Sequence, residues 1–327
     1  MTGPRYPARI AAGFLVCVLL WALSGCAQMV PQTVSLRTGW PQGVPQQAEL
    51  PGVPFFPQEE YQCGPAALAT VLSYAGVQVT PEALIPQVYL PSRQGSLQLE
   101  MLATPRRWGR VSYQLAPSYA DLLREVAAGN PVIVLQDVGP LFAKWHYAVV
   151  NGFDYPSGTL LLRSGTKRRY EMPLTAFERE WMKSGYWAMV VTPADRIPVT
   201  ATEEGWVASV LAMARSGDAA SAATAYATAL KRWPDNLPAA IGLANQLHAR
   251  GALPQAVEVL REAQKRHPQS VIVLNNLAQA LSDQGQHEQA LAEIDKATDP
   301  QNPFASEVRS TRQLIVQRLA QQKTGRR

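Results

Sequence analysis

The pattern of hydrophobic and polar positions changes character near residue 200. From residue 53 to residue 197, segments with the apolar spacing of a helix alternate with short runs of strand character. From residue 203 onward only the helical spacing is present. Helices combined with consecutive antiparallel strands predict an α+β domain for residues 53–197, and the helical remainder predicts an all-α domain.

The first of these parts is expected to contain several helices and a run of strands. Its first helix starts at Cys63 and ends at Gly76, and a second helix has Thr80 as its cap. Further helices are predicted over residues 96–108, 118–128 and 175–182, and strands over residues 111–115, 131–135, 146–153, 159–163, 170–172 and 187–192. Residues 154–158 have the composition of a turn, so the strands on either side of them are expected to form a hairpin.

The helix that starts at Cys63 has the features of a helix that presents a nucleophile. It is apolar on nearly all sides, which predicts burial, and Pro65 suits its first turn. A thiol at a helix N-terminus lies at the positive end of the helix dipole, which favours the thiolate. Gln58 lies five residues upstream. The alternative is that Cys63 is a small buried hydrophobic residue, the commonest role of a lone thiol.

A thiol nucleophile needs a base, and His146 is the histidine expected in the same domain as Cys63. The other three histidines, His248, His267 and His287, fall in the helical second part. His146 opens a predicted strand, on the same face as the alternate residues that follow it. A purely structural histidine is the alternative interpretation.

At these residues the chain resembles the bacteriocin-processing, double-glycine leader peptidases, which are papain-like cysteine peptidases. The likeness rests on Gln58 to Leu68, with its Cys-Gly-Pro-Ala-Ala sequence, on residues 131–134 and on the stretch after His146, and it spans roughly residues 50–195. It implies a papain-like fold, with Cys63 as nucleophile, His146 as general base and Gln58 as the side-chain donor of the oxyanion hole. Gln62 is a second choice for that donor.

The chain departs from the family at the residue that orients the histidine. The family has an aspartate on the strand after the histidine's strand, and the matching position here is Ser164. A hydroxyl can accept the imidazole N–H, but it stabilises imidazolium less than a carboxylate does. Asp154 belongs to the turn and is too far along the strand, and Asn151 is expected to face away from His146. The expected activity is therefore weak or absent if Ser164 orients poorly.

The N-terminus resembles that of a bacterial lipoprotein. Residues 1–25 read as a signal peptide, with Arg5 and Arg9 before an apolar run, and Leu-Ser-Gly-Cys ending at Cys26 resembles a lipobox. The resemblance implies a lipidated Cys26, and Ala27 after it implies an outer-membrane lipoprotein that faces the periplasm. Residues 26–52, rich in Pro, Gln and Gly, are expected to form a flexible tether. An ordinary signal peptide with a chance cysteine is the alternative.

The helical part contains an internal repeat of 34 residues that resembles tetratricopeptide repeats. Three repeats are expected, over residues 203–236, 237–270 and 271–304, followed by a capping helix over residues 305–321. The equivalent positions are Gly217, Gly251 and Gly285; Ala222, Ala256 and Ala290; Ala229, Ala263 and Ala297; Trp206, Ala240 and Leu274; and Tyr226, Leu260 and Ile294. The resemblance implies a concave groove that binds a partner protein or an extended peptide.

Charge and composition exclude several classes of function. The net charge of +5 is small and scattered, so no nucleic-acid partner is expected, and the basic run at residues 167–169 reads as a solvated hairpin end. With one cysteine and one histidine, the domain has too few ligands for a zinc site. No phosphate-binding or dinucleotide-binding motif is present, so no cofactor is expected. Cys17, Cys26 and Cys63 do not form a disulfide framework.

The sequence thus predicts an exported, lipid-anchored cysteine peptidase that cleaves peptide or protein substrates, with repeats that bind a protein partner. Two alternatives stay open. One is a weak or inactive peptidase-like scaffold that works through its repeats, and the other is a thiol amidase that acts on cell-wall peptides.

Overall fold

The structure is a computed structural model that describes residues 30–57, 62–216, 218–299 and 301–324. The chain forms two compact units. The first contains the described residues up to Met101 together with Gln114–Val191, and the second contains Leu102–Tyr113 together with the described residues from Thr192 onward. The predicted signal peptide, Cys26 and Gln58 lie outside the described residues.

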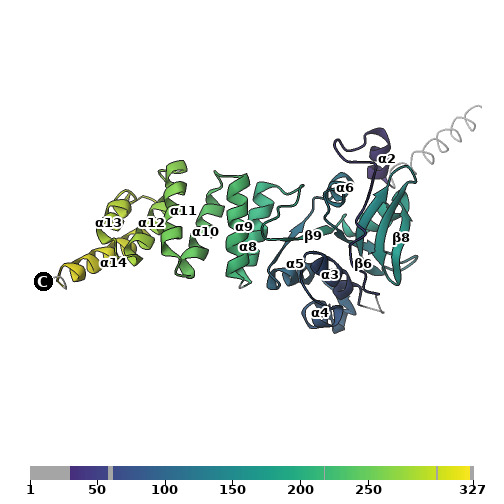
Figure 1. Ribbon diagram of the computed structural model, residues 1–327, viewed down its shortest axis with the longest axis horizontal. Coiled ribbons are helices and arrows are strands. Elements are labelled where there is room, and N and C mark those ends of the chain that lie inside the picture. Colours follow the sequence, from purple (N-terminus) through teal and green to yellow (C-terminus); the bar gives the residue numbers. More distant parts are fainter. Residues whose placement is uncertain (1–29, 58–61, 217, 300, 325–327) are drawn as a thin grey trace, which may run out of the picture. The chain divides into compact units, whose positions relative to one another are not determined.

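The first unit combines one antiparallel sheet with several helices, as the sequence predicts (Figure 1). Its helices are α2 (Pro31–Thr38), α3 (Cys63–Tyr74), α4 (Pro81–Val88), the start of α5 (Gln98–Arg107), α6 (Tyr119–Ala127) and α7 (Leu174–Trp181). Its strands are β1 (Gln47–Glu49), β5 (Val132–Asp137), β6 (Trp145–Asp154), β7 (Thr159–Ser164), β8 (Lys167–Pro173) and β9 (Ala188–Pro193). A separate two-stranded hairpin consists of β2 (Tyr89–Leu90) and β3 (Gly95–Ser96), and the sequence pattern did not predict it.

Strand β6 lies at the centre of the sheet, in the order β9–β5–β6–β7–β8, and β1 pairs with its far end. In the register of β5 with β6, Gln136 is opposite His146. A β-bulge between Val150 and Gly152 shifts the register of β6 with β7. The order of the strands therefore sets β5 on one side of His146 and β7 on the other.

Helix α3 is buried as its composition predicts. Every residue from Gly64 to Leu72 is buried, and the helix packs against β6 and β5. A helix that is apolar on all sides gains free energy only when protein surrounds it. The N-terminal end of α3, which carries Cys63, is consequently held in a fixed position beside the start of β6.

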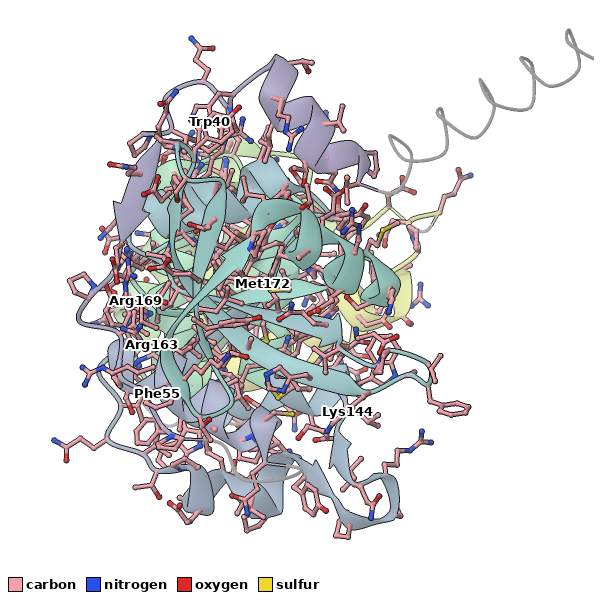
Figure 2. All side chains as sticks on the ribbon, turned by 90° about the vertical axis from the view of Figure 1, so that its right-hand side faces the viewer. Trp40, Phe55, Lys144, Arg163, Arg169 and Met172 are labelled. Carbon is pink, nitrogen blue, oxygen red and sulfur yellow. The ribbon has the colours of Figure 1, made fainter. Side chains whose placement is uncertain are left out.

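The flexible tether predicted for residues 26–52 is a wrong prediction from Pro31 onward. Helix α2 covers Pro31–Thr38, and β1 pairs with β6. Trp40, labelled in Figure 2, packs on the ring of Tyr155 at a centroid distance of 4.3 Å. The buried carboxylate of Glu178 accepts hydrogen bonds from the backbone N–H groups of Gln32 and Thr33, at 2.9 and 2.6 Å. This carboxylate satisfies N–H groups that no local side chain caps, so the helix stays attached to the first unit.

The second unit is helical apart from strand β4 (Arg110–Gln114). Its helices are α8 (Glu203–Arg215), α9 (Ala219–Arg232), α10 (Leu237–Ala249), α11 (Leu253–Arg266), α12 (Val271–Asp283), α13 (His287–Asp295) and α14 (Ala305–Thr324). Consecutive helices pack against one another (Figure 1). Gly251 and Gly285 have φ angles of +73° and +80°, which a side chain would disfavour. None of the helices among the described residues has both the length and the apolar character that a membrane span requires.

Candidate active site

Cys63 is the first residue of α3, and its sulfur lies beside the backbone of β6. Burial raises the pKa of the Cys63 thiol, whereas the backbone N–H groups of Tyr147, Gly64 and Cys63 itself lower it to a smaller extent. The thiolate expected from the helix dipole alone is therefore not the resting form, because desolvation outweighs the backbone donors. The site holds a protonated thiol at neutral pH.

His146 is the second residue of β6, and its ring is hydrogen-bonded to the last residue of β7. The Nε2 atom of His146 lies 2.9 Å from the Oγ atom of Ser164. Burial, assisted by the nearby charge of Lys144, lowers the pKa of His146 to about 4. The imidazole is therefore neutral at pH 7, with one nitrogen protonated and the other not.

The direction of the hydrogen bond between His146 and Ser164 decides whether the imidazole can act as a base. If Nε2 carries the proton and donates it to Ser164, the Nδ1 atom keeps its lone pair and can accept a proton. If the Ser164 hydroxyl donates instead, the proton is on Nδ1, and the lone pair on Nε2, the one that could accept a proton, is already occupied by the Ser164 hydroxyl. Both arrangements fit the distance.

Cys63 and His146 line one cavity of about 920 Å³. The hairpin of β2 and β3 supplies part of its wall, and the residues around the start of β6 supply another part. The cavity is lined by Cys63, Arg93, Gln94, Gly95, Ser96, Leu97, Gln98, Leu135, Ala143, Lys144, Trp145, His146, Tyr147, Gly165, Lys183 and Ser184. Enclosed space next to a thiol and a neutral imidazole is what a thiol hydrolase needs for its substrate.

The other residues singled out in the sequence lie as follows. Gln62 is at the N-cap of α3, directly before Cys63. Asp154 is at the far end of β6, where it accepts a hydrogen bond from Gln47 in the turn region. Asn151 is buried and donates to the backbone oxygen of Leu50. Neither Asp154 nor Asn151 contacts His146, so Ser164 is the partner of the ring among the described residues.

The sequence analysis gave no role in the site to Ser96 and Tyr147, whereas Gly64 belongs to the Cys-Gly-Pro-Ala-Ala sequence that carries the family resemblance. A β-carbon on Gly64 would lie 2.2 Å from the Ser96 hydroxyl, so a larger residue after Cys63 would displace the β3 wall. The Tyr147 hydroxyl donates to the backbone oxygen of Ser96 at 3.2 Å. Gly64 was the one residue in the sequence that could have indicated a close approach of another segment to Cys63. Strand β3 itself is too short to give a periodic pattern.

The described residues contain no group of three or more histidine, cysteine, aspartate or glutamate side chains placed to hold a metal ion. What the described site offers is a thiol, a neutral imidazole and a hydroxyl partner for that imidazole. This set of groups can transfer a proton and form a thioester.

The chain was compared with known protein families, curated proteins and solved structures. Residues 50–189 match the peptidase C39-like family, and residues 213–270 and 247–315 match the tetratricopeptide repeat. No curated protein matches the chain.

Several solved structures are similar to parts of the chain. A C39-like peptidase from Bacillus anthracis is 18% identical over 45% of this chain and 97% of its own, with a TM-score of 0.39. The peptidase domain of Streptococcus ComA, a transporter of a quorum-sensing pathway, is 22% identical over 43% of this chain and 98% of its own, with a TM-score of 0.37. The TPR2B domain of yeast Sti1, solved in a complex with pHsp70, is 21% identical over 35% of this chain and 96% of its own, with a TM-score of 0.34.

The two family matches fall on the two kinds of architecture seen in the chain. The match over residues 50–189 covers α3, β6 and β7, and the repeat matches fall on the run of helices from α8 to α14. The protein combines a domain of the peptidase C39-like family with tetratricopeptide repeats.

Proposed function

We propose that the protein is an exported, lipid-anchored cysteine peptidase whose repeats bind a partner protein or an extended peptide. The observation that supports this most directly is the cavity that Cys63 and His146 line together, with the His146 ring held by Ser164. A thiol at a helix N-terminus beside a neutral, hydrogen-bonded imidazole is the arrangement that nucleophilic catalysis requires.

In the proposed reaction, Nδ1 of His146 takes the proton of the Cys63 thiol. The thiolate attacks the carbonyl carbon of a peptide bond, and the resulting oxyanion is stabilised by the backbone N–H of Cys63 and the side chain of Gln58. One such donor contributes about 3 kcal/mol to transition-state stabilisation. The imidazolium then gives its proton to the leaving amine, and water hydrolyses the thioester with His146 as base.

In the proposal, the lipid and the repeats determine where this reaction takes place. Lipidation of Cys26 holds the protein at the outer membrane, facing the periplasm, and the repeats bring a partner or substrate to it. Export of a bacteriocin is not part of the proposal, although similar peptidase domains belong to transporters.

A scaffold that does not turn over substrate is the second candidate, and two observations favour it. Burial raises the pKa of the thiol and lowers the pKa of the imidazole, so the transfer of a proton between them is uphill in the empty site. Ser164 is neutral and compensates the imidazolium less than a carboxylate does. Under this reading the cavity binds a peptide and the repeats carry the function.

A peptide-library digest separates the two candidates. The full chain is incubated with a mixture of peptides, and new termini are identified by mass spectrometry. We expect cleavage by the wild type, none by Cys63→Ala, and unchanged cleavage by Ser157→Ala, a control in the exposed turn after β6. Equal cleavage by wild type and Cys63→Ala would rule out thiol catalysis. Binding without cleavage by either would establish the scaffold.

A further inference from the structure

The loop between β5 and β6, residues 138–144, holds its shape through hydrogen bonds at its base. The carboxylate of Asp137 accepts from the backbone N–H groups of Gly139 and Lys144, at 3.0 and 2.8 Å. The N–H of Val138 donates to the backbone oxygen of Lys144 at 3.0 Å. A β-carbon on Gly139 would lie 1.8 Å from the backbone oxygen of Phe142, which shows how tightly the loop is curled.

This fixed loop carries the two most exposed large apolar side chains among the described residues. Leu141 is 89% exposed and Phe142 is 87% exposed. Neither lines the cavity of Cys63, whereas the next residues, Ala143, Lys144 and Trp145, do. The loop next to Lys144 projects from the edge of the first unit (Figure 2). The pair therefore belongs neither to the core nor to the substrate cavity.

The apolar tip of the loop, formed by Leu141 and Phe142, is too small to form a stable protein interface. A specific interface buries about 800 Å² on each partner, whereas one aromatic side chain supplies about 150–250 Å². Two adjacent side chains at the end of a narrow loop have instead the shape that enters the headgroup region of a bilayer, where no complementary surface is needed.

The residues below the tip have the side chains that favour the membrane–water interface. Trp145 is half-exposed, and tryptophan places its ring at the level of the headgroups. Lys144, Lys183 and Arg93 are the described lysine and arginine residues that line the cavity, and no described aspartate or glutamate lines it. Lys183 pairs with Asp137 at 3.3 Å. Basic side chains at this level are attracted by anionic lipid headgroups.

Helix α2 is attached to the first unit, and this attachment would keep the unit near a bilayer that holds the predicted lipid. Val30 is buried in the first unit, and Glu178 holds the start of α2. The predicted lipid site, Cys26, is only four residues before Val30, a span of at most about 14 Å. A lipid at that position, as the proposed function has it, would keep the first unit close to the bilayer surface.

We propose that Leu141 and Phe142 insert into the surface of a lipid bilayer and set the mouth of the Cys63 cavity against it. The membrane contact does not depend on catalysis, because neither side chain is part of the site that would carry out hydrolysis.

Quenching of tryptophan fluorescence by brominated lipid tests the contact. The full chain is extracted from the membranes of the cells that produce it and reconstituted in vesicles of neutral and anionic lipids with brominated acyl chains. Phe142→Trp is compared with the matched control Phe304→Trp, a partly exposed position in the repeat part. Each emission is measured as the difference from the wild type. We expect the added emission of Phe142→Trp to fall at least two-fold in brominated vesicles and that of Phe304→Trp to stay unchanged.

Two results would overturn the proposal. One is equal quenching, or no quenching, of both added tryptophans. The other is an unquenched Phe142→Trp together with a several-fold rise in KM for peptide cleavage in the Leu141→Ser, Phe142→Ser double variant, which would assign the loop to substrate binding. Loss of peptidase activity has no bearing on the fluorescence, so this test and that of the catalytic proposal fail independently.

Discussion

Serine and aspartate hold an imidazole ring in different ways. A carboxylate only accepts hydrogen bonds, so it fixes the tautomer with a proton on the nearer nitrogen, and its charge stabilises imidazolium. The Ser164 hydroxyl both donates and accepts, and it is neutral. At 2.9 Å from Nε2 it keeps the His146 ring in place while leaving its tautomer undetermined.

Replacement of Ser164 by aspartate should therefore increase activity. A hydrogen bond to a charged group stabilises by about 1 kcal/mol more than a neutral one, which corresponds to roughly a five-fold to ten-fold increase in kcat/KM. Steady-state cleavage of a peptide found in the library digest provides the measurement. Ser157→Asp is the matched control and should have no effect. An unchanged or lower kcat/KM in a folded Ser164→Asp protein, with Ser164→Ala also unchanged, would show that this position does not orient the base.

The depressed pKa of His146 predicts that acid destabilises the first unit. The folded-state pKa is about 4, below the ordinary value of 6.5, so between these values the unfolded chain binds a proton that the folded chain does not. Stability contributed by the neutral ring is therefore present above pH 6.5 and is lost as the pH falls toward 4. At pH 5 the loss is about 2 kcal/mol. Urea unfolding at pH 7 and pH 5 provides the measurement.

The control for the acid effect is His146→Gln, in which the titrating ring is absent. The difference in unfolding free energy between pH 7 and pH 5 should be smaller in this variant than in the wild type by about 2 kcal/mol. An identical pH dependence in the two proteins would mean that His146 is not buried in its neutral form.

At the scale of helices and strands, the spacing of apolar and polar residues predicted the elements that depend on residues close in sequence. The apolar spacing of α3 and α6 reflects burial, and Ser118 caps α6 by accepting from the N–H of Asp121 at 3.2 Å. The strands β5, β6 and β7 followed from short apolar runs and a turn. The turn also predicted that Ser164 lies near His146, although the register of β6 with β7, in which Val149 pairs with Arg163, does not place the two residues directly opposite each other. These features depend on residues close in sequence, which is why the sequence was sufficient for them.

Features that depend on distant residues could not be predicted in this way. Helix α2 has no local capping side chain, because Glu178, some 145 residues away, satisfies its first N–H groups. Residues 26–52 consequently read as a tether. The sequence predicted that Cys63 lies at a helix N-terminus, but it did not predict the burial that raises the pKa of the thiol. Strand β3, which forms part of the cavity wall, has two residues, so it is too short to show the alternation of apolar and polar residues that predicts a strand.

The Glu178 carboxylate should contribute measurably to the stability of the first unit. In Glu178→Gln an amide replaces one of the two oxygens that accept from Gln32 and Thr33, so buried donors lose a charged partner. We expect a loss of about 1–3 kcal/mol in unfolding free energy, measured with urea at pH 7. The control is Glu171→Gln, an exposed glutamate that pairs with Arg169 and should cost less than about 1 kcal/mol. Equal losses in both variants would show that the contact with α2 adds nothing specific.

For the molecule as a whole, we propose that the N-terminus and the repeats determine where catalysis takes place. Ala222, Ala256 and Ala290, which occupy the same position in consecutive repeats, are fully buried. A stack of this kind offers a surface for a partner. The first unit supplies the cavity, and the predicted lipid supplies the location.

Lipidation is tested by a cysteine substitution. If Cys26 carries the lipid, Cys26→Ser should abolish incorporation of labelled palmitate, and Cys17→Ser, the matched control within the apolar run, should leave incorporation unchanged. The measurement is radiolabel on the protein band after growth with labelled fatty acid. Incorporation that survives Cys26→Ser would refute the lipoprotein prediction.

Formation of the acyl-enzyme tests most directly whether Cys63 attacks an acyl group with His146 as its base. The full chain is mixed with an activated peptide ester, and the covalent adduct is followed by intact mass spectrometry and mapped to a residue. We predict an adduct on Cys63 that is absent in Cys63→Ala. In His146→Ala it should form about 100-fold to 10,000-fold more slowly, and in His267→Ala, a histidine of the repeats, at the wild-type rate. An adduct on another residue, or a rate that is the same in His146→Ala and the wild type, would contradict the claim.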